Sequence, residues 1–230
     1  MLFQKKRALA ITFGILSACL SFSLWSHNIS ESNAQFVEGV EGAAIAPFMY
    51  LGAKHMVTGY DHLLFLVGVI FFLFRLKDVV LYVSLFTLGH SITLLGGVLG
   101  GLQVNAYLID AIIGFSIVYK AFENMGGFEK VFHFQPNTKI AVLFFGLFHG
   151  LGLATKLQDF SIAKDGLITN IISFNIGVEI GQIIALSFIL ILFWRWRQMA
   201  SFNKHAFLAN SLLMTGGFLL AGYQLTGYFA

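Results

Sequence analysis

The sequence predicts an all-α polytopic membrane protein, a six-helix transmembrane bundle preceded by an N-terminal signal or anchor helix. Of its 230 residues, 57% are hydrophobic and only 11% are charged. A soluble domain of this length carries about a quarter charged residues, so most of this surface must face lipid. The apolar stretches are too long for strands and lack the ten-residue alternation of an outer-membrane barrel, which favours helices.

Seven apolar stretches have about the length of a transmembrane helix. They cover roughly residues 8–26, 45–74, 79–100, 104–122, 139–157, 167–194 and 205–229. No long polar stretch divides the last six, so we predict one membrane domain over residues 45–230. Residues 27–44 form a short polar linker before it, and residues 123–138 form the longest inner loop.

The first stretch, residues 1–26, has more than one interpretation. Basic residues at positions 5–7 precede an apolar run, which is typical of a cleaved signal peptide and equally of an uncleaved anchor helix. Residues 32–34 would serve as a small-residue cleavage site. Residues 16–19 resemble a bacterial lipobox, which would place a lipid on Cys19. Because this is the single cysteine, neither a disulfide framework nor a thiolate metal cluster is expected.

The basic residues are distributed unevenly along the chain. If the N-terminus is cytoplasmic, all of the Lys and Arg residues except Lys54, Lys156 and Lys164 fall at cytoplasmic ends, as the positive-inside rule requires. We therefore predict a multi-pass protein of the bacterial inner membrane, with the linker and the C-terminus in the periplasm. The net charge of +3 is too small and too dispersed to indicate a nucleic-acid partner.

Ionisable side chains lie near the middle of four predicted helices. An acidic side chain at that depth costs about 2.5–3.5 kcal/mol on insertion scales, so these groups must face one another, water or an ion. They are Asp61, His62, His90, His149 and Glu179. A single histidine in a membrane helix is more often an interhelical hydrogen-bond partner than a ligand. Four helices carrying such groups at one depth favour a metal or proton site.

The segment from His55 to His62 is the densest of these clusters. In a continuous helix the two histidines share a face and lie about 10.5 Å apart along the axis. A metal–nitrogen bond measures only about 2.0–2.1 Å, so we predict that His62 binds the ion and that His55 is an entry station nearer the outer surface. Asp61 is either a ligand or the carboxylate that orients an imidazole on a neighbouring helix.

Further polar residues accompany these candidates. Four of them share a helix face with His90 or Glu179 and would extend a polar stripe into the bundle. A fifth lies near the outer end of its helix, where it would face either the site or water. These supporting residues are Thr87, Ser91, Asn175, Gln182 and Asp110.

The six helices after residue 45 also suggest an internal repeat. Two sets of three helices would cross the bilayer in opposite directions, because three is an odd number. His62 and His149 lie midway along the first helix of each set, and His90 and Glu179 lie midway along the second. Inverted repeats place a substrate site at the midplane between their halves. A 3+3 inverted repeat is therefore a hypothesis for this chain.

Four short motifs occur in order along these helices. They are His55-Met-Val-Thr-Gly-Tyr-Asp61-His62, Leu88-Gly89-His90-Ser91, Phe148-His149-Gly150-Leu151-Gly152 and Gly177-Val-Glu179-Ile-Gly181. Together, over about residues 45–228, they resemble the HupE/UreJ family of hydrogenase and urease accessory membrane proteins, with Met56 where many members have proline. The chain is more distantly similar to the nickel/cobalt transporters, which have one residue fewer between the histidine and the Asp-His pair. The resemblance implies a nickel or cobalt permease.

The leading functional hypothesis is accordingly a divalent transition-metal permease. Imidazole and carboxylate ligands without cysteine suit Ni²⁺, Co²⁺ or Zn²⁺ better than Cu(I). No phosphate-binding G-x-x-x-x-G-K-S/T loop occurs, so uptake would use the membrane potential or proton exchange. Two alternatives stay open. One is an intramembrane zinc-dependent hydrolase with a metal-activated water. The other is a small structural or accessory subunit of a larger membrane complex, such as one for hydrogenase or urease maturation.

Overall fold

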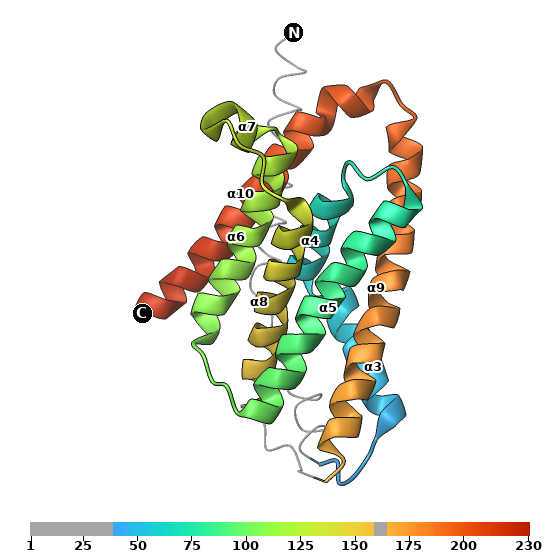
Figure 1. Cartoon of the computed structure of the whole chain (residues 1–230), viewed down its shortest axis with the longest axis vertical. Helices are drawn as coiled ribbons and strands as arrows, with labels where there is room; N and C mark the ends of the chain where they lie inside the picture. The colour runs from blue at the N-terminus through green and yellow to red at the C-terminus, as the bar shows by residue number, and fades with distance from the viewer. Residues whose placement is uncertain (1–38, 159–164) are drawn as a thin grey trace, which may run out of the picture.

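The computed structural model describes residues 39–158 and 165–230, and every regular element within these ranges is a helix (Figure 1). The helices are α3 (Ile45–Thr58), α4 (Tyr60–Ile70), α5 (Leu76–Gly100), α6 (Ala106–Asn124), α7 (Gly127–Phe132), α8 (Thr138–Gln158), α9 (Leu167–Arg197) and α10 (Ser201–Phe229). The all-α prediction is confirmed for this part of the chain. The predicted signal or anchor helix, Cys19, most of the linker and Lys164 lie outside the described residues.

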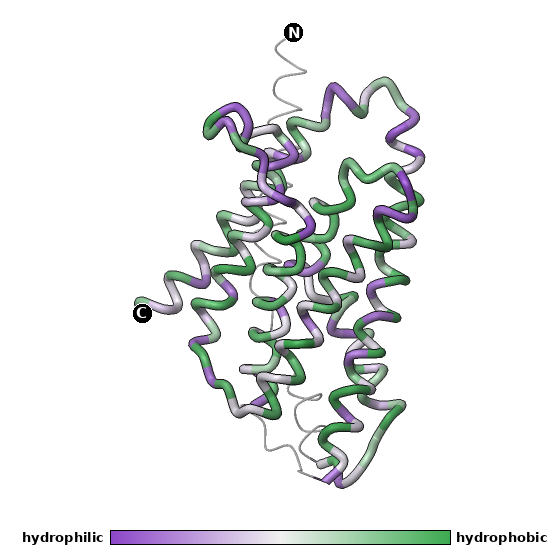
Figure 2. Tube along the Cα trace, viewed as in Figure 1, coloured by the Kyte–Doolittle hydropathy of each residue, from purple (hydrophilic) through white to green (hydrophobic). Residues whose placement is uncertain are grey.

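Among the described residues, four helices, α5, α8, α9 and α10, are long and apolar enough to cross a membrane, whereas α4 is apolar but shorter. Hydrophobic residues make up most of the length of the helices, and hydrophilic residues are frequent around α7 and the α9–α10 turn (Figure 2). On α9, for example, Ile183, Phe188 and Ile191 are all exposed, as expected for side chains that face lipid tails. The chain is therefore an α-helical membrane protein, while the count of six spans stays a prediction.

The predicted helix over residues 45–74 is not continuous, because it breaks at Gly59 between α3 and α4. Gly59 has an extended backbone, with φ −76° and ψ 91°. Its N–H donates to the carbonyl of His55 at 2.8 Å, and its own carbonyl accepts from the N–H of Leu63 at 3.1 Å. A Cβ at this position would lie 2.9 Å from the His55 oxygen and 3.1 Å from Nδ1 of His62. Glycine therefore allows the chain to break where both histidines crowd the backbone.

The membrane helices pack most closely as three pairs, α5 with α8, α3 with α9, and α6 with α10. Glycines allow this close approach. Gly150 of α8 lies against the carbonyl of His90 on α5, and Gly177 of α9 lies against the carbonyl of Met49 on α3. Between them, α4 and α8 form the middle of the bundle (Figure 1). The core accordingly lies around α4, with Phe65, Leu66 and Ile70 almost wholly buried.

Basic residues gather at the end of the bundle where α7 lies. The chain reaches this end at the α4–α5 loop, around α7 and at the α9–α10 turn (Figure 1). The described Lys and Arg residues at these positions are Arg75, Lys77, Lys130, Lys139, Arg195, Arg197 and Lys204. The distribution agrees with the predicted orientation, in which this end is cytoplasmic.

Arg197 connects the end of α9 to the end of α4. Its guanidinium donates to the carbonyls of Ile70, Phe71 and Leu73. These carbonyls belong to the last turn of α4 and the residues after it, where intrahelical donors are missing. The contact therefore fixes the C-terminal end of the short helix that carries His62.

Candidate metal centre

A group of potential metal ligands lies at the break between α3 and α4. Asp61, His62 and His149 each offer one ligand atom, and the three atoms lie within 4.8 Å of one another. All three residues are at least 98% buried. Asp61 and His62 come from the first turn of α4, and His149 comes from the middle of α8. The fold thus brings residues from two separate sequence motifs into one buried set of potential metal ligands. We call Asp61, His62 and His149 the donor set, because each can donate a lone pair to a metal ion.

Asp61 contacts its own neighbour rather than an imidazole of another helix. Its Oδ1 lies 3.0 Å from Nδ1 of His62. A carboxylate can only accept, so the His62 Nδ1–H is the donor and the lone pair of this imidazole is on Nε2. Metal-binding histidines commonly have a carboxylate partner of this kind, which fixes the ring and its tautomer. Asp61 therefore orients His62.

His149 is oriented by the backbone of its own helix. Its Nδ1 lies 2.7 Å from the carbonyl oxygen of Phe145, so Nδ1–H donates and Nε2 is the basic nitrogen. That Nε2 is buried and has no hydrogen-bond partner among the described residues. A buried acceptor without a partner is costly, and an imidazole lone pair held in one direction is the arrangement that a metal ion requires.

Two more histidines flank this group. The ring centroid of His62 lies 4.7 Å from that of His149, 5.1 Å from that of His55 and 5.9 Å from that of His90. The predicted separation of His55 from His62 was wrong, because the break at Gly59 turns both side chains toward one space. The imidazoles of His55, His90 and His149, from α3, α5 and α8, therefore all lie close to the ring of His62 on α4.

Aromatic side chains pack against the histidines. The ring of Phe86 lies 4.9 Å from that of His149 and 6.2 Å from that of His62, and the ring of Phe65 lies 5.5 Å from that of His149. Both phenylalanines are about 99% buried. Their apolar surface lowers the local dielectric constant, which strengthens any interaction of the donor set with a charge.

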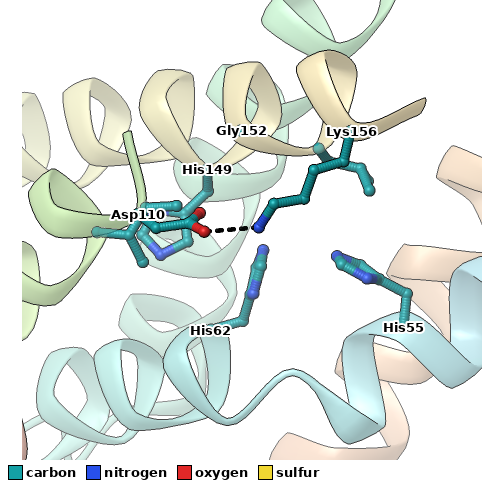
Figure 3. Close-up of a pocket in the computed structure, with 8 residues that line it drawn as sticks. His55, His62, Asp110, His149, Gly152 and Lys156 are labelled. Atoms are coloured by element: carbon teal, nitrogen blue, oxygen red, sulfur yellow. Dashed lines mark hydrogen bonds and ion pairs between the residues drawn. The ribbon is translucent and has the colours of Figure 1, made fainter. Parts of the chain in front are cut away.

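A small cavity lies beside His55, His62 and His149 (Figure 3). Its volume is about 10 Å³, which is room for one water-sized particle. The lining residues are His55, His62, Asp110, Ile113, His149, Gly152, Leu153 and Lys156. Asp110, predicted as a supporting residue, reaches the cavity from α6 and forms an ion pair of 2.7 Å with Lys156 of α8.

Lys156 is a residue that the sequence interpretation did not connect with the site. It was expected only as one of the basic residues on the outer side. The available signal was its position seven residues after His149, which places both side chains on the same face of a helix. The ion pair with Asp110 could not be read from the sequence, because it joins two helices.

The remaining predicted site residues lie in a second groove, between α5 and α9. Glu179 is exposed and lines this groove, whose volume is about 650 Å³, together with Thr87, Ser91 and Gln182. The Thr87 hydroxyl donates to Gln182 at 2.8 Å, and the Ser91 hydroxyl donates to Asn175 at 3.2 Å. Glu179 is therefore not part of the donor set formed by Asp61, His62 and His149.

A comparison with protein families tests the family resemblance that the four motifs suggested. The family described as HupE / UreJ protein matches residues 31–230. The chain belongs to the HupE/UreJ family. The matched region includes α3 to α10, and hence the donor set, the cavity and the groove of this family member. The comparison with curated proteins found no match, and neither did the comparison with solved structures.

Proposed function

We propose that this protein is a permease for a divalent transition-metal ion, which binds between Asp61, His62 and His149. The observation that carries the proposal is the buried Nε2 of His149, which has no hydrogen-bond partner in the part of the chain that the structure describes. The Phe145 carbonyl orients its ring, and Asp61 and His62 each offer a ligand atom within 4.8 Å. His55 and His90 are the additional ligands on either side, as their ring distances to His62 allow.

The donor types support Ni²⁺, Co²⁺ or Zn²⁺ as the cargo. Imidazole nitrogen and carboxylate oxygen suit these ions, whereas Cu(I) prefers thiolate and thioether ligands. Membership of the HupE/UreJ family, whose resemblance implies nickel or cobalt transport, favours the first two. In this proposal the ion is the substrate and passes through the site.

The broken helix supports a transport role. Discontinuous helices form the substrate sites of many secondary transporters, where helix ends meet at mid-membrane. His55 lies in the last turn of α3, the end with partial negative charge, and Asp61 lies in the first turn of α4. The α3 end thus favours a cation beside it, and Asp61 is a carboxylate whose own charge the α4 end stabilises.

The helix packing supports the hypothesis of an inverted repeat. Gly89 of α5 contacts Leu143 of α8, and Gly177 of α9 contacts Met49 of α3. In the same two interfaces Gly146 contacts Phe86, and Gly52 contacts Phe174. On α5 and α9 the glycine follows the phenylalanine by three residues, and on α8 and α3 the glycine follows Leu143 or Met49 by three residues. The contacts of the two interfaces therefore match. The α5–α8 pair therefore corresponds to the α9–α3 pair.

The third helix pair fits the same correspondence. Gly114 of α6 contacts Ala221 of α10, while Gly217 of α10 contacts Val118 of α6. The two helices are antiparallel (Figure 1), and a two-fold rotation that interchanges them would map the Gly114–Ala221 contact onto the Gly217–Val118 contact. This register relates His55 to His149, since each follows Gly52 or Gly146 by three residues, and differs from the sequence pairing of His62 with His149. We propose a 3+3 inverted repeat in this register.

The proposed route connects the cavity to the groove between α5 and α9. His55 faces the half of the bundle opposite α7, which we assign to the periplasm. The ring of His90 lies 5.9 Å from that of His62, and on the same helix α5 the groove residues Ser91 and Thr87 are the next residue and one turn earlier. Glu179 would then bind the ion after His90, on the way to the cytoplasmic end. The membrane potential or proton exchange would drive uptake.

Flux through reconstituted vesicles tests the proposal. The full chain is placed in liposomes that contain a fluorescent chelator, and Ni²⁺, Co²⁺ or Zn²⁺ is added outside. We expect saturable entry that is lost in His62→Ala and His149→Ala. His205→Ala, an exposed histidine near the α7 end, is the matched control and should transport normally. Stoichiometric binding without entry would contradict a permease, and retained zinc with turnover of a lipid or amide would favour the hydrolase.

A further inference from the structure

The ion pair between Lys156 and Asp110 lies inside the cavity of the proposed metal site. The two charged atoms are 2.7 Å apart, and the side chains are 17% and 5% exposed. Figure 3 shows the ammonium of Lys156 directed at Asp110, in the cavity that His62 also lines. A fixed positive charge thus occupies the space beside the imidazoles, where a divalent ion would have to bind.

Only one of the two carboxylate oxygens of Asp110 accepts a hydrogen bond from Lys156. Oδ2 accepts from the Lys156 ammonium, whereas Oδ1 is buried and has no hydrogen-bond partner among the described residues. A carboxylate has about four acceptor positions, and a buried acceptor without a partner is costly. The free oxygen belongs to a residue that lines the same cavity as His62 and His149. Asp110 is therefore in place to accept a second cation.

The ammonium and a divalent ion cannot both remain in this space at low energy. Two positive charges a few ångströms apart repel strongly when little water separates them. Lys156 has a flexible four-carbon stem and lies two residues before the end of α8. Its side chain is the more exposed of the pair, so the ammonium can move from the cavity toward the surface.

We propose that Asp110 is a further ligand of the metal ion and that Lys156 is a built-in counter-cation, which holds Asp110 until the ion displaces its ammonium. The inference rests on the proposed function, since it requires that a divalent cation binds next to His62 and His149. It assigns the two residues to opposite effects. Asp110 strengthens ion binding, and Lys156 weakens it.

Ion binding to single and double variants of the full chain tests this assignment. Affinity for Ni²⁺, Co²⁺ and Zn²⁺ is measured by equilibrium dialysis in lipid nanodiscs. We expect Lys156→Gln to bind about tenfold more tightly, because the competing charge is gone. Asp110→Asn should bind more weakly than the native chain, and the double variant should bind more weakly than Lys156→Gln alone. Lys139→Gln, an exposed lysine at the opposite end, removes the same charge and should have no effect.

A second measurement on the native chain does not depend on the folding of variants. Lys156 is labelled with a water-soluble amine reagent and quantified by mass spectrometry, with and without saturating Zn²⁺ or Ni²⁺. We expect the labelling of Lys156 to rise when the ion is bound. Unchanged or reduced labelling would overturn the inference, as would a Lys156→Gln affinity equal to that of the native chain.

These results separate the inference from the proposed function. If the native chain binds none of the three ions, both are overturned. If the native chain binds an ion and His149→Ala loses it, while Lys156→Gln changes nothing, then the metal site stands and only the role of Lys156 and Asp110 is wrong.

Discussion

His55 and His62 face each other across the break between α3 and α4, with their ring centroids 5.1 Å apart. In one continuous helix these side chains would lie about two turns apart. The single non-helical residue between the two helices, Gly59, thus brings a second imidazole to the donor set. The geometry of the proposed metal site therefore depends on the backbone conformation of Gly59.

The first prediction concerns the helix break itself. Gly59→Ala introduces a Cβ that meets the His55 carbonyl oxygen at 2.9 Å and Nδ1 of His62 at 3.1 Å. We expect the two imidazoles to move apart and metal affinity to fall about tenfold or more, because ligand geometry within about 0.5 Å matters in such sites. Equilibrium dialysis measures the effect. Gly96→Ala is the control, since nothing lies within 4 Å of that position.

The second prediction concerns the carboxylate beside His62. Asp61→Asn keeps the size of the side chain but removes the charge that fixes the His62 tautomer. Changes to such partners typically reduce metal affinity by about 10–100-fold, and we expect a loss of that order. His62→Ala should abolish binding in the same assay. An Asp61→Asn protein with native affinity would show that Asp61 neither orients His62 nor binds the ion.

The third prediction concerns the close contact of α5 with α8. Gly150→Ala places a Cβ against the carbonyl of His90 and the hydroxyl of Thr93. Overpacking of this kind typically destabilises a protein by about 1–3 kcal/mol, so thermal unfolding in detergent should begin at a lower temperature. Gly216→Ala has open space around its Cβ and should unfold like the native chain. Equal behaviour of the two variants would contradict the packing.

The fourth prediction concerns the connection between α9 and α4. Arg197→Gln removes a guanidinium that donates to Leu73 at 2.9 Å and to Phe71 at 2.8 Å. Hydrogen bonds to charged groups contribute about 1.5–3 kcal/mol each, so we expect clear destabilisation in the same unfolding measurement. Arg195→Gln changes an exposed arginine two residues away and serves as the control. Similar losses in both variants would indicate a general charge effect instead.

Much of the fold followed from composition and from the length of the apolar stretches. Each predicted stretch after residue 45 contains a helix of the structure, because a chain in lipid must satisfy its backbone hydrogen bonds internally. The break within the first of these stretches did not follow. A glycine inside an apolar helix is common in membranes, and the break at Gly59 is evident only from its extended backbone in the structure.

The candidate site was predicted in part. His62, His90 and His149 were expected at one depth, and their rings do approach one another. Glu179 was expected among them, yet it lines the groove between α5 and α9. Depth along a helix can be counted from the sequence, but the direction of a side chain around the axis depends on which face the neighbouring helices cover.

The sequence by itself determined an α-helical membrane protein of the HupE/UreJ family with ionisable side chains near the middle of its helices, because hydropathy, helix length and motif order are properties of single segments. Only the tertiary structure decided which of those side chains meet. His149 of α8 meets His62 and Asp61 of α4, and the contact of α6 with α8 sets Lys156 against Asp110. These contacts join residues that are far apart in the chain. They depend on how the helices pack against one another, which close glycine contacts decide.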